Sequence, residues 1–176
     1  MADHVLVQCS FDRHADAMLE IFNDAILNST ALYDYAPWTR DTMVAWFEAK
    51  RAGGFPVIGV EDGGGRLMGF GSYGTFRARP ACKYTVEHSV YVHRDFRRRG
   101  IGRILLGELI ARARQGGLHA LVGGIDASNT ASIAIHKEFG FREVGFLPEV
   151  AFKFGRWLDL VFYQLILDTP ANPVDG

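Results

Sequence analysis

Apolar residues recur at helical spacing near the start of the chain. Within residues 12–28 they stand three or four positions apart, at Ala15, Leu19, Phe22 and Ile26. This spacing predicts an amphipathic helix, and Ser10 or Asp12 is placed to cap its first turn. A second, short helix is expected after Thr39, where the apolar residues are Met43, Trp46 and Phe47.

Strand-like patterns dominate the middle and the end of the chain. Residues 56–61 and 66–73 are joined by Asp62-Gly63-Gly64-Gly65, and such a glycine run is typical of a hairpin turn. Further strand-like runs follow at residues 84–92, 120–125, 144–153 and 158–167. The run at 120–125 is short and apolar throughout, as buried parallel strands are.

Two more helices are expected between these strands. Residues 101–115 carry one apolar face, and Gly116-Gly117 ends the pattern. Residues 129–139 form the other helix, which ends at Gly140. The order of helix, helix, strands, helix, strand, helix, strands predicts an α/β (α+β) fold with a mixed sheet.

Composition narrows the class of protein. The chain has 176 residues, 48% of them hydrophobic and 22% charged, which fits one compact globular domain. With 19 basic and 20 acidic residues there is no global field that would attract nucleic acid or a membrane. Residues 1–8 do not resemble a signal peptide, no run is long enough to span a bilayer, and Cys9 and Cys82 form no disulfide framework. A cytoplasmic protein is therefore expected.

The most informative segment runs from Val90 to Gly102. A strand-like run leads into a turn with three arginines and two glycines, and an amphipathic helix begins at once, at Ile101. Glycine permits close backbone approach, while the first amides of a helix lack internal acceptors and favour an anion. Charge beside those amides comes from Arg97, Arg98 and Arg99. The segment predicts a diphosphate site centred on Gly100 and Gly102.

The alternative for this segment is a solvated basic turn before a surface helix. The strand before it, the helix after it and the spacing of the glycines favour phosphate binding. The turn is neither a Walker A loop, because the Gly-Lys-Ser/Thr ending is missing, nor a G-x-G-x-x-G fingerprint.

The pattern Arg97-x-x-Gly100-x-Gly102 after a strand resembles the coenzyme A motif of the GNAT N-acetyltransferase superfamily. Three further segments resemble its phosphinothricin and methionine-sulfoximine acetyltransferase branch: Thr85-Val-Glu-His-Ser-Val-Tyr-Val92, Ile135-His-Lys-Glu-Phe-Gly-Phe141 and Lys153-Phe-Gly-Arg-Trp-Leu-Asp159. The resemblance covers nearly the whole chain. It implies the GNAT acyl-CoA N-acyltransferase fold, with a central mixed, mostly antiparallel sheet flanked by helices. The GNAT domain would take residues 1–168, and residues 169–176 would be a flexible tail.

The resemblance also implies an activity. The chain would move an acetyl group directly from acetyl-CoA to the α-amino group of a small amino-acid-like substrate, of the methionine sulfoximine, methionine sulfone or phosphinothricin type. Acetyl-CoA would be the cosubstrate, and the branch is typically homodimeric. The alternatives are acetylation of another small amine or of a protein N-terminus, or a coenzyme-sensing module without turnover. Histidine and cysteine spacing matches no metal motif, so no metal is expected.

Glu87 is the expected general base. It stands in the middle of a strand, where a carboxylate is unusual, and it matches the glutamate that the related enzymes use to deprotonate the amine. An outward-facing strand glutamate is the alternative. His88 is a weaker candidate, because side chains alternate along a strand and it should face the opposite side.

Coenzyme contacts are expected along the same strand and in a later helix. The resemblance implies that the pantetheine arm lies along the backbone of Ser89, Val90, Tyr91 and Val92. Asn129, Ser132 and His136 share one helical stripe, and Lys137 is expected to be exposed near phosphate. Many family members have a tyrosine at His136 as the acid for the leaving thiolate. A histidine can donate a proton near neutral pH, although a half-buried structural histidine is the alternative.

The acceptor pocket is expected around the strand of Glu87. The resemblance implies that Phe76, Arg77, Ala78, Val86, Glu87 and His88 line it. Arg77 is the choice for a substrate carboxylate, which a guanidinium can bind in bidentate fashion, and a solvated loop arginine is the alternative. Aromatic walls are expected from Tyr33, Tyr35, Phe154 and Trp157, where core packing would equally explain them.

Overall fold

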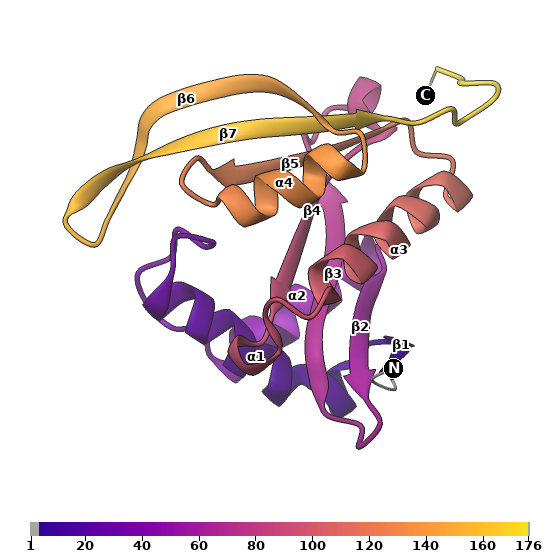
Figure 1. Cartoon of the computed structure of the whole chain (residues 1–176). Coiled ribbons are helices and arrows are strands. Elements are labelled where there is room, and N and C mark those ends of the chain that lie inside the picture. Colours follow the sequence, from indigo (N-terminus) through magenta and orange to yellow (C-terminus); the bar gives the residue numbers. More distant parts are fainter. Residues whose placement is uncertain (1–3, 176) are drawn as a thin grey trace. The chain divides into compact units, whose positions relative to one another are not determined.

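The computed structural model describes residues 4–175 (Figure 1). In chain order the helices and strands are β1 (His4–Gln8), α1 (Phe11–Asn28), α2 (Arg40–Ala52), β2 (Val57–Asp62), β3 (Leu67–Thr75), η1 (Pro80–Cys82), β4 (Thr85–Val92), η2 (Arg94–Phe96), α3 (Ile101–Gln115), β5 (Ala120–Asp126), α4 (Thr130–Glu138), β6 (Arg142–Lys153) and β7 (Arg156–Ile166). Residues 1–3 of the N-terminal segment and residue 176 of the tail, both considered above, lie outside the described residues.

Strand β1 and the two short helical turns η1 and η2 were not expected from the sequence. Strand β1 pairs antiparallel with β2, from His4 opposite Asp62 to Gln8 opposite Ile58. Val5 and Leu6, which are 56% and 44% exposed, contribute little to a core. A strand of this kind carries no alternation of buried and exposed residues, so its sequence gives no strand signal. The other expected elements are confirmed, with boundaries shifted by one or two residues.

The cap of α2 is confirmed in detail. The Thr39 side chain accepts a hydrogen bond from the Thr42 amide at 3.2 Å, and Thr42 Oγ1 accepts one from the Thr39 amide at 3.4 Å. The two residues thus form a reciprocal capping box with threonine in place of the usual glutamate. At α1, by contrast, the Ser10 side chain makes no capping hydrogen bond. The Ser10 amide instead donates to Nδ1 of His14 at 2.9 Å.

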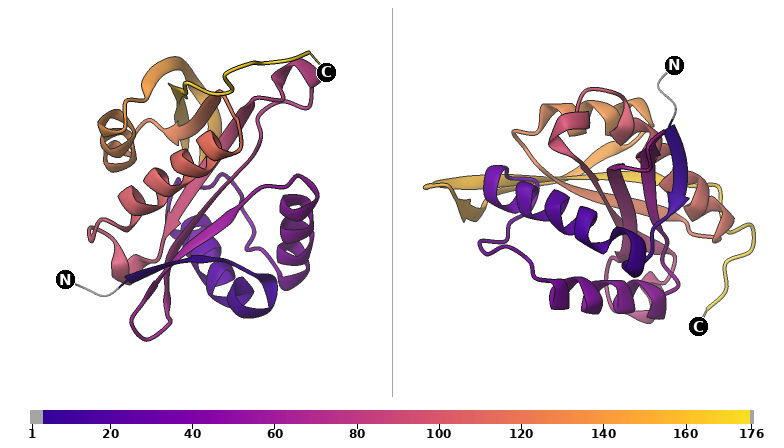
Figure 2. Two further views of the ribbon diagram at one scale, coloured as in Figure 1. Left: turned by 90° about the vertical axis from the view of Figure 1, so that its right-hand side faces the viewer. Right: turned by 90° about the horizontal axis from the view of Figure 1, so that it is seen from below.

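The chain divides into two compact units, and the first contains the residues up to Gly74 together with Ser89–Leu109. Helices α1 and α2 lie side by side in it (Figure 2) and share a core with β2 and β3. Phe22 of α1 is central to that core, since its ring centroid lies 4.4 Å from that of Trp38, 4.8 Å from that of Phe70 and 4.9 Å from that of Tyr91.

Two glycines of β3 determine how closely the next elements approach. A Cβ at Gly69 would lie 2.8 Å from the backbone oxygen of Tyr91 and 3.1 Å from Ile101 Cγ2. A Cβ at Gly71 would lie 2.9 Å from Leu109 Cδ1. Because both side chains are single hydrogens, β4 and α3 pack tightly on β3. This packing holds in place the strand and the helix on either side of the arginine–glycine turn.

The second unit contains Thr75–His88 and the residues from Ile110 onward. Here β4 pairs parallel with β5, while β5 pairs antiparallel with β7 and β7 antiparallel with β6. The strand order is β4-β5-β7-β6, and β6 and β7 form a long hairpin (Figure 1). The division between the units falls within β4, after His88, so β4 also ends the strand order β1-β2-β3-β4. The sheet is mixed and mostly antiparallel, as expected. None of the helices in the described part of the chain has the length and hydropathy needed to cross a bilayer.

Candidate active site

The arginine–glycine turn opens α3 in the first unit. Gly100 adopts φ +81°, and nothing lies within 4 Å of where its Cβ would be. The first hydrogen bond of the helix runs from the Ile104 amide to the Gly100 carbonyl at 3.1 Å. The amides of Ile101 and Gly102 precede that bond in the first turn, where helical amides have no intrahelical acceptor. A bare glycine beside a helix N-terminus is therefore suited to receive a phosphate.

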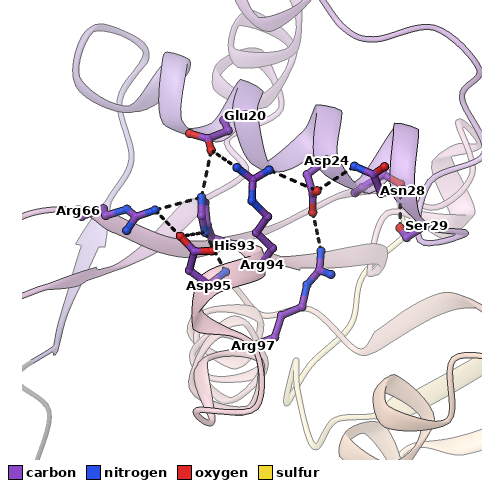
Figure 3. A network of polar contacts seen from close by, with 10 residues as sticks. Glu20, Asp24, Asn28, Ser29, Arg66, His93, Arg94, Asp95 and Arg97 are labelled. Atoms are coloured by element: carbon purple, nitrogen blue, oxygen red, sulfur yellow. Dashed lines mark hydrogen bonds and ion pairs between the residues drawn. The ribbon is translucent and has the colours of Figure 1, made fainter.

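The arginines of this turn are exposed, but contacts with neighbouring side chains restrain them. Arg97 Nη2 lies 2.7 Å from Asp24 Oδ2 on α1, and the Arg99 guanidinium carbon lies 5.4 Å from the centroid of the Phe96 ring. Arg98 adopts φ +63°, a left-handed conformation that is uncommon for a residue with a side chain. The basic charge expected at this turn is present, and part of it is tied to α1 (Figure 3).

Glu87 and its neighbours in β4 point to opposite faces of the strand. Val86 and His88 are buried, whereas Glu87 is exposed. Burial of part of its side chain nevertheless raises the pKa of the Glu87 carboxyl. The carboxylate lies over β5, where a Cβ on Gly124 would come within 3.3 Å of Glu87 Oε1. A carboxylate with a raised pKa is better matched to taking a proton near neutral pH.

The parallel ladder between β4 and β5 is short. It joins Thr85 to Ala120, Val86 to Leu121 and Glu87 to Val122. Beyond this point β4 continues to Val92 and β5 continues to Asp126. The ladder thus ends at Glu87, two residues before Ser89, where the backbone segment begins that the family resemblance implies as the contact of the pantetheine arm.

His88 and His136 form a buried pair behind Glu87. Their Nε2 atoms are 2.8 Å apart, and Nδ1 of His136 lies 2.7 Å from the carbonyl oxygen of Ser132. A carbonyl oxygen can only accept, so Nδ1 of His136 carries the hydrogen. In the neutral ring Nε2 of His136 is then an acceptor, and Nε2 of His88 must donate to it. Nδ1 of His88 is buried without a hydrogen-bond partner.

This pair is held in its neutral form. The pKa of His88 is lowered to about 3, mainly by burial and to a smaller extent by the neighbouring His136. The backbone of Val122 acts in the opposite direction and raises it. Burial also lowers the pKa of His136. Gly123 makes room for both rings, because a Cβ there would lie 2.9 Å from His88 Cε1 and 3.1 Å from His136 Nε2. Phe141 packs beside both, at centroid distances of 5.2 and 5.0 Å.

The remaining coenzyme candidates lie at α4. The Asn129 side chain accepts a hydrogen bond from the Ser132 amide at 3.1 Å and so caps the helix. Lys137 is exposed, with Nζ 5.9 Å from the centroid of the Tyr163 ring. The stripe expected from spacing is present, since His136 contacts Ser132 one turn earlier.

The acceptor candidates lie in the loop that leads from β3 to η1. Arg77 and Ala78 are exposed and Phe76 is half-buried, and the Arg77 guanidinium carbon lies 5.6 Å from the centroid of the Phe76 ring. The loop belongs to the same unit as Glu87. His88 does not face Glu87, so any contact from it to the acceptor would come from its main chain.

The expected aromatic walls are largely exposed. Tyr35 is 73% exposed, and Phe154 and Trp157 at the β6–β7 turn are 57% and 59% exposed. None of these three rings is core, which excludes the alternative that they serve only to pack the interior. In the described part of the chain, no group of three or more His, Cys, Asp or Glu side chains is placed to hold a metal ion.

Three features of the site were missed by sequence reasoning. The Gly123-Gly124 pair could have indicated that other groups approach β5 closely, because glycines inside a strand often mark such an approach. The pairing of His88 with His136 joins a strand and a helix whose residues are 48 positions apart, so only the folded structure reveals it. Asp24 gave no signal either, because it looks like any polar residue on the outer face of a helix.

Comparisons with known proteins give the family. A model described as Acetyltransferase (GNAT) family matches residues 17–141. The chain is 46% identical to the L-methionine sulfoximine/L-methionine sulfone acetyltransferase of Pseudomonas paraeruginosa, covering 86% of this chain and 88% of that protein.

Solved structures agree. A protein of Acinetobacter baylyi ADP1 described as an acetyltransferase is 53% identical, with coverage of 100% and 99% and a TM-score of 0.98. The structure of yncA from Salmonella typhimurium with its cofactor acetyl-CoA is 40% identical, with coverage of 98% and 99% and a TM-score of 0.92. The chain belongs to the acetyltransferase (GNAT) family.

Proposed function

We propose that this chain transfers an acetyl group from acetyl-CoA directly to the α-amino group of a small amino-acid-like acceptor of the methionine sulfoximine, methionine sulfone or phosphinothricin type. The observation that carries the proposal is Glu87, an exposed carboxylate with a raised pKa at the point where the β4–β5 ladder ends. The similarity to the Pseudomonas paraeruginosa enzyme supports the acceptor class.

The residues present fit acetyl-CoA as a substrate. Gly100 leaves open space where a side chain would stand, and the first amides of α3 follow at once. In our proposal the diphosphate contacts these amides and the side chains of Arg97, Arg98 and Arg99, while the backbone of Ser89–Val92 holds the pantetheine arm. Further contacts come from Asn129, Ser132 and Lys137.

Glu87 is the general base of the proposal. It takes a proton from the acceptor ammonium, directly or through a water, and the free amine then attacks the thioester carbonyl. As the new N–C bond forms and the C–S bond breaks, the nitrogen gives up its second proton, and the coenzyme leaves as a thiolate that takes up one proton. In the proposal, an amide of β4, at Val90 or Tyr91, stabilises the negative charge on the carbonyl oxygen.

The acid role of His136 stays a prediction. The hydrogen bonds of the ring determine which protonation form such a role requires. Because Nδ1 donates to the Ser132 carbonyl and Nε2 faces His88, the ring has a proton to give only when both nitrogens carry hydrogen. The lowered pKa makes that form scarce at neutral pH. An acid role therefore requires that replacing His136 by Asn changes the pH dependence of kcat.

For the acceptor we propose Arg77 as the partner of its carboxylate, with Phe76 and Ala78 beside it. Arg77 is exposed and lies in the loop of the unit that also contains Glu87. The main chain of Val86 and His88 completes the proposed contacts, because both side chains are buried.

We also propose a homodimer in the cytoplasm, with residues 1–168 acting as one acetyltransferase domain. Large apolar side chains are exposed along the β6–β7 hairpin at Val144, Phe146, Leu147, Val150, Phe152, Phe154, Trp157 and Ile166. A group of exposed apolar residues on one element favours an interface. Both cysteines are free, as a reducing compartment would keep them.

An acceptor screen tests the proposed activity. Purified protein is mixed with acetyl-CoA and methionine sulfone, methionine sulfoximine, phosphinothricin, common amino acids, a polyamine or a peptide, and free thiol is followed. The proposal predicts the highest kcat/KM with one of the amino-acid analogues. Turnover confined to the polyamine or the peptide would exclude the proposed acceptor class, and coenzyme binding without turnover would indicate a sensing module.

A further inference from the structure

One face of α1 carries an acidic stripe toward the arginine–glycine turn. Glu20, Asp24 and Asn28 are spaced four apart and therefore share that face. Asn28 Nδ2 donates to Asp24 Oδ1 at 3.0 Å. The Asp24 side chain is only 10% exposed, which is low for a carboxylate on a surface helix.

Two arginines from beyond β4 meet this stripe (Figure 3). Arg97 Nη2 lies 2.7 Å from Asp24 Oδ2, and Arg94 Nη1 lies 3.5 Å from Asp24 Oδ1. Arg94 also reaches Glu20, with Nη2 3.4 Å from Oε1. Each carboxylate oxygen of Asp24 thus pairs with an arginine, Oδ1 with Arg94 and Oδ2 with Arg97.

The backbone ahead of the turn is fixed independently. His93 is 5% exposed, and its amide donates to the Met68 carbonyl at 2.9 Å. Its Nδ1 accepts from the Asp95 amide at 3.2 Å, so its Nε2 faces Glu20 Oε1, at 3.2 Å, as a donor. The backbone at the start of the turn is therefore held by β3 and by Glu20 of α1, whereas Asp24 contacts the side chains of Arg94 and Arg97. What Asp24 adds is control over the side chain of Arg97.

An arginine restrained in this way binds a phosphate at lower entropic cost. An unrestrained arginine loses side-chain conformational entropy when a ligand orders it. Asp24 orders Arg97 through one nitrogen, and the guanidinium has further N–H donors to offer. About half of each arginine side chain remains exposed, 51% for Arg97 and 55% for Arg94. The carboxylate also carries negative charge, which by itself would repel a phosphate.

From this arrangement we infer that Asp24 is a positioning residue for the coenzyme, holding Arg97 where its free N–H groups meet the diphosphate. The inference rests on the proposed function, because it needs acetyl-CoA bound at the turn. Asp24 contacts neither the acetyl group nor the acceptor in this scheme. Its effect should therefore fall on coenzyme binding and leave the chemical step unchanged.

The test replaces Asp24 by Asn, which keeps the shape and removes the charge, and by Ser, which removes both. Each variant should raise the KM for acetyl-CoA about tenfold, the value of one charge-assisted contact, with kcat unchanged. Acetyl-pantetheine, a donor that lacks the diphosphate, should give the same kcat/KM with wild type and variants. Asp16→Asn is the matched control, since Asp16 lies on α1, is 81% exposed and pairs with Arg40 instead.

Each outcome has one meaning. An unchanged or lowered KM for acetyl-CoA in both variants overturns the inference, a lowered value showing that the carboxylate mainly repels phosphate. Equal losses with acetyl-CoA and acetyl-pantetheine, or an equal loss in Asp16→Asn, indicate a general effect on the fold and also overturn it. Wild-type protein that fails to bind acetyl-CoA in calorimetry would instead remove the proposed function on which the inference rests.

Discussion

At the residue scale, the two neighbouring glycines of β5 serve opposite faces of the sheet. Gly123 makes room for the histidine pair and Gly124 for the carboxylate of Glu87. Neither glycine is needed for a turn, and neither adopts a positive φ. The lack of a side chain is what matters at both positions, because each one borders a chemically important group.

Replacing Gly124 by Ala should displace the Glu87 carboxylate. A methyl group 3.3 Å from Oε1 is a tight contact that the flexible side chain relieves by moving. Small displacements of a catalytic group are costly, so kcat should fall roughly tenfold to a hundredfold, while calorimetry shows unchanged binding of acetyl-CoA. Gly145→Ala is the control, because its nearest contact, Phe162 Cδ2, is 3.8 Å away. Equal kcat values for the two variants would contradict this role of Gly124.

At the scale of single elements, much of the site could be predicted. The register of β4 follows from alternation, so Glu87 was correctly separated from His88. The start of α3 and the Asn129 cap of α4 follow from turn and cap chemistry. Contacts between elements could not be predicted, because the partners of Asp24 and His88 depend on how distant segments pack. The edge strand β1 was missed because Val7 is its only partly buried residue and the other four are exposed.

The contact between β4 and α4 gives a spectroscopic prediction. His136 should be the tautomer with hydrogen on Nδ1 and His88 the tautomer with hydrogen on Nε2, because the Ser132 carbonyl can only accept. Burial lowers the pKa of His88 to about 3, so this ring should stay neutral at pH 6, and burial also lowers the pKa of His136, so its ring should be neutral at pH 7. Nitrogen-15 NMR of labelled histidines reads the tautomers directly. An Nε2 tautomer at His136, or protonation of His88 near pH 6, would disprove the arrangement.

At the scale of the whole molecule, the exposed apolar residues of the β6–β7 hairpin predict association. Replacing Phe146 by Glu and Trp157 by Lys together should convert a dimer to a monomer in sedimentation velocity, since these side chains are 53% and 59% exposed in the single chain. Val174→Glu, at a side chain 65% exposed outside the hairpin, should leave the dimer intact. A wild-type protein that sediments as a monomer at micromolar concentration would contradict the proposed dimer.

The role of Glu87 is also linked to stability. Its carboxyl pKa is raised in the folded protein, so the folded state favours the protonated form. The contribution of this carboxyl to folding stability is therefore fully present below the pKa of the unfolded state. It is lost as the pH rises through the pKa of the folded state. Glu87→Gln should be at least as stable as wild type at neutral pH. Loss of activity in this variant would consequently report on chemistry.

The pH dependence of kcat in wild type and Glu87→Gln, with acetyl-CoA and methionine sulfone as substrates, tests the central claim most directly. The wild-type rate should fall as the pH drops through the raised carboxyl pKa. The variant should lose about a hundredfold to ten-thousandfold in kcat, most strongly near and below neutral pH, and should bind acetyl-CoA with wild-type affinity. An unchanged rate and pH profile would remove Glu87 from the mechanism.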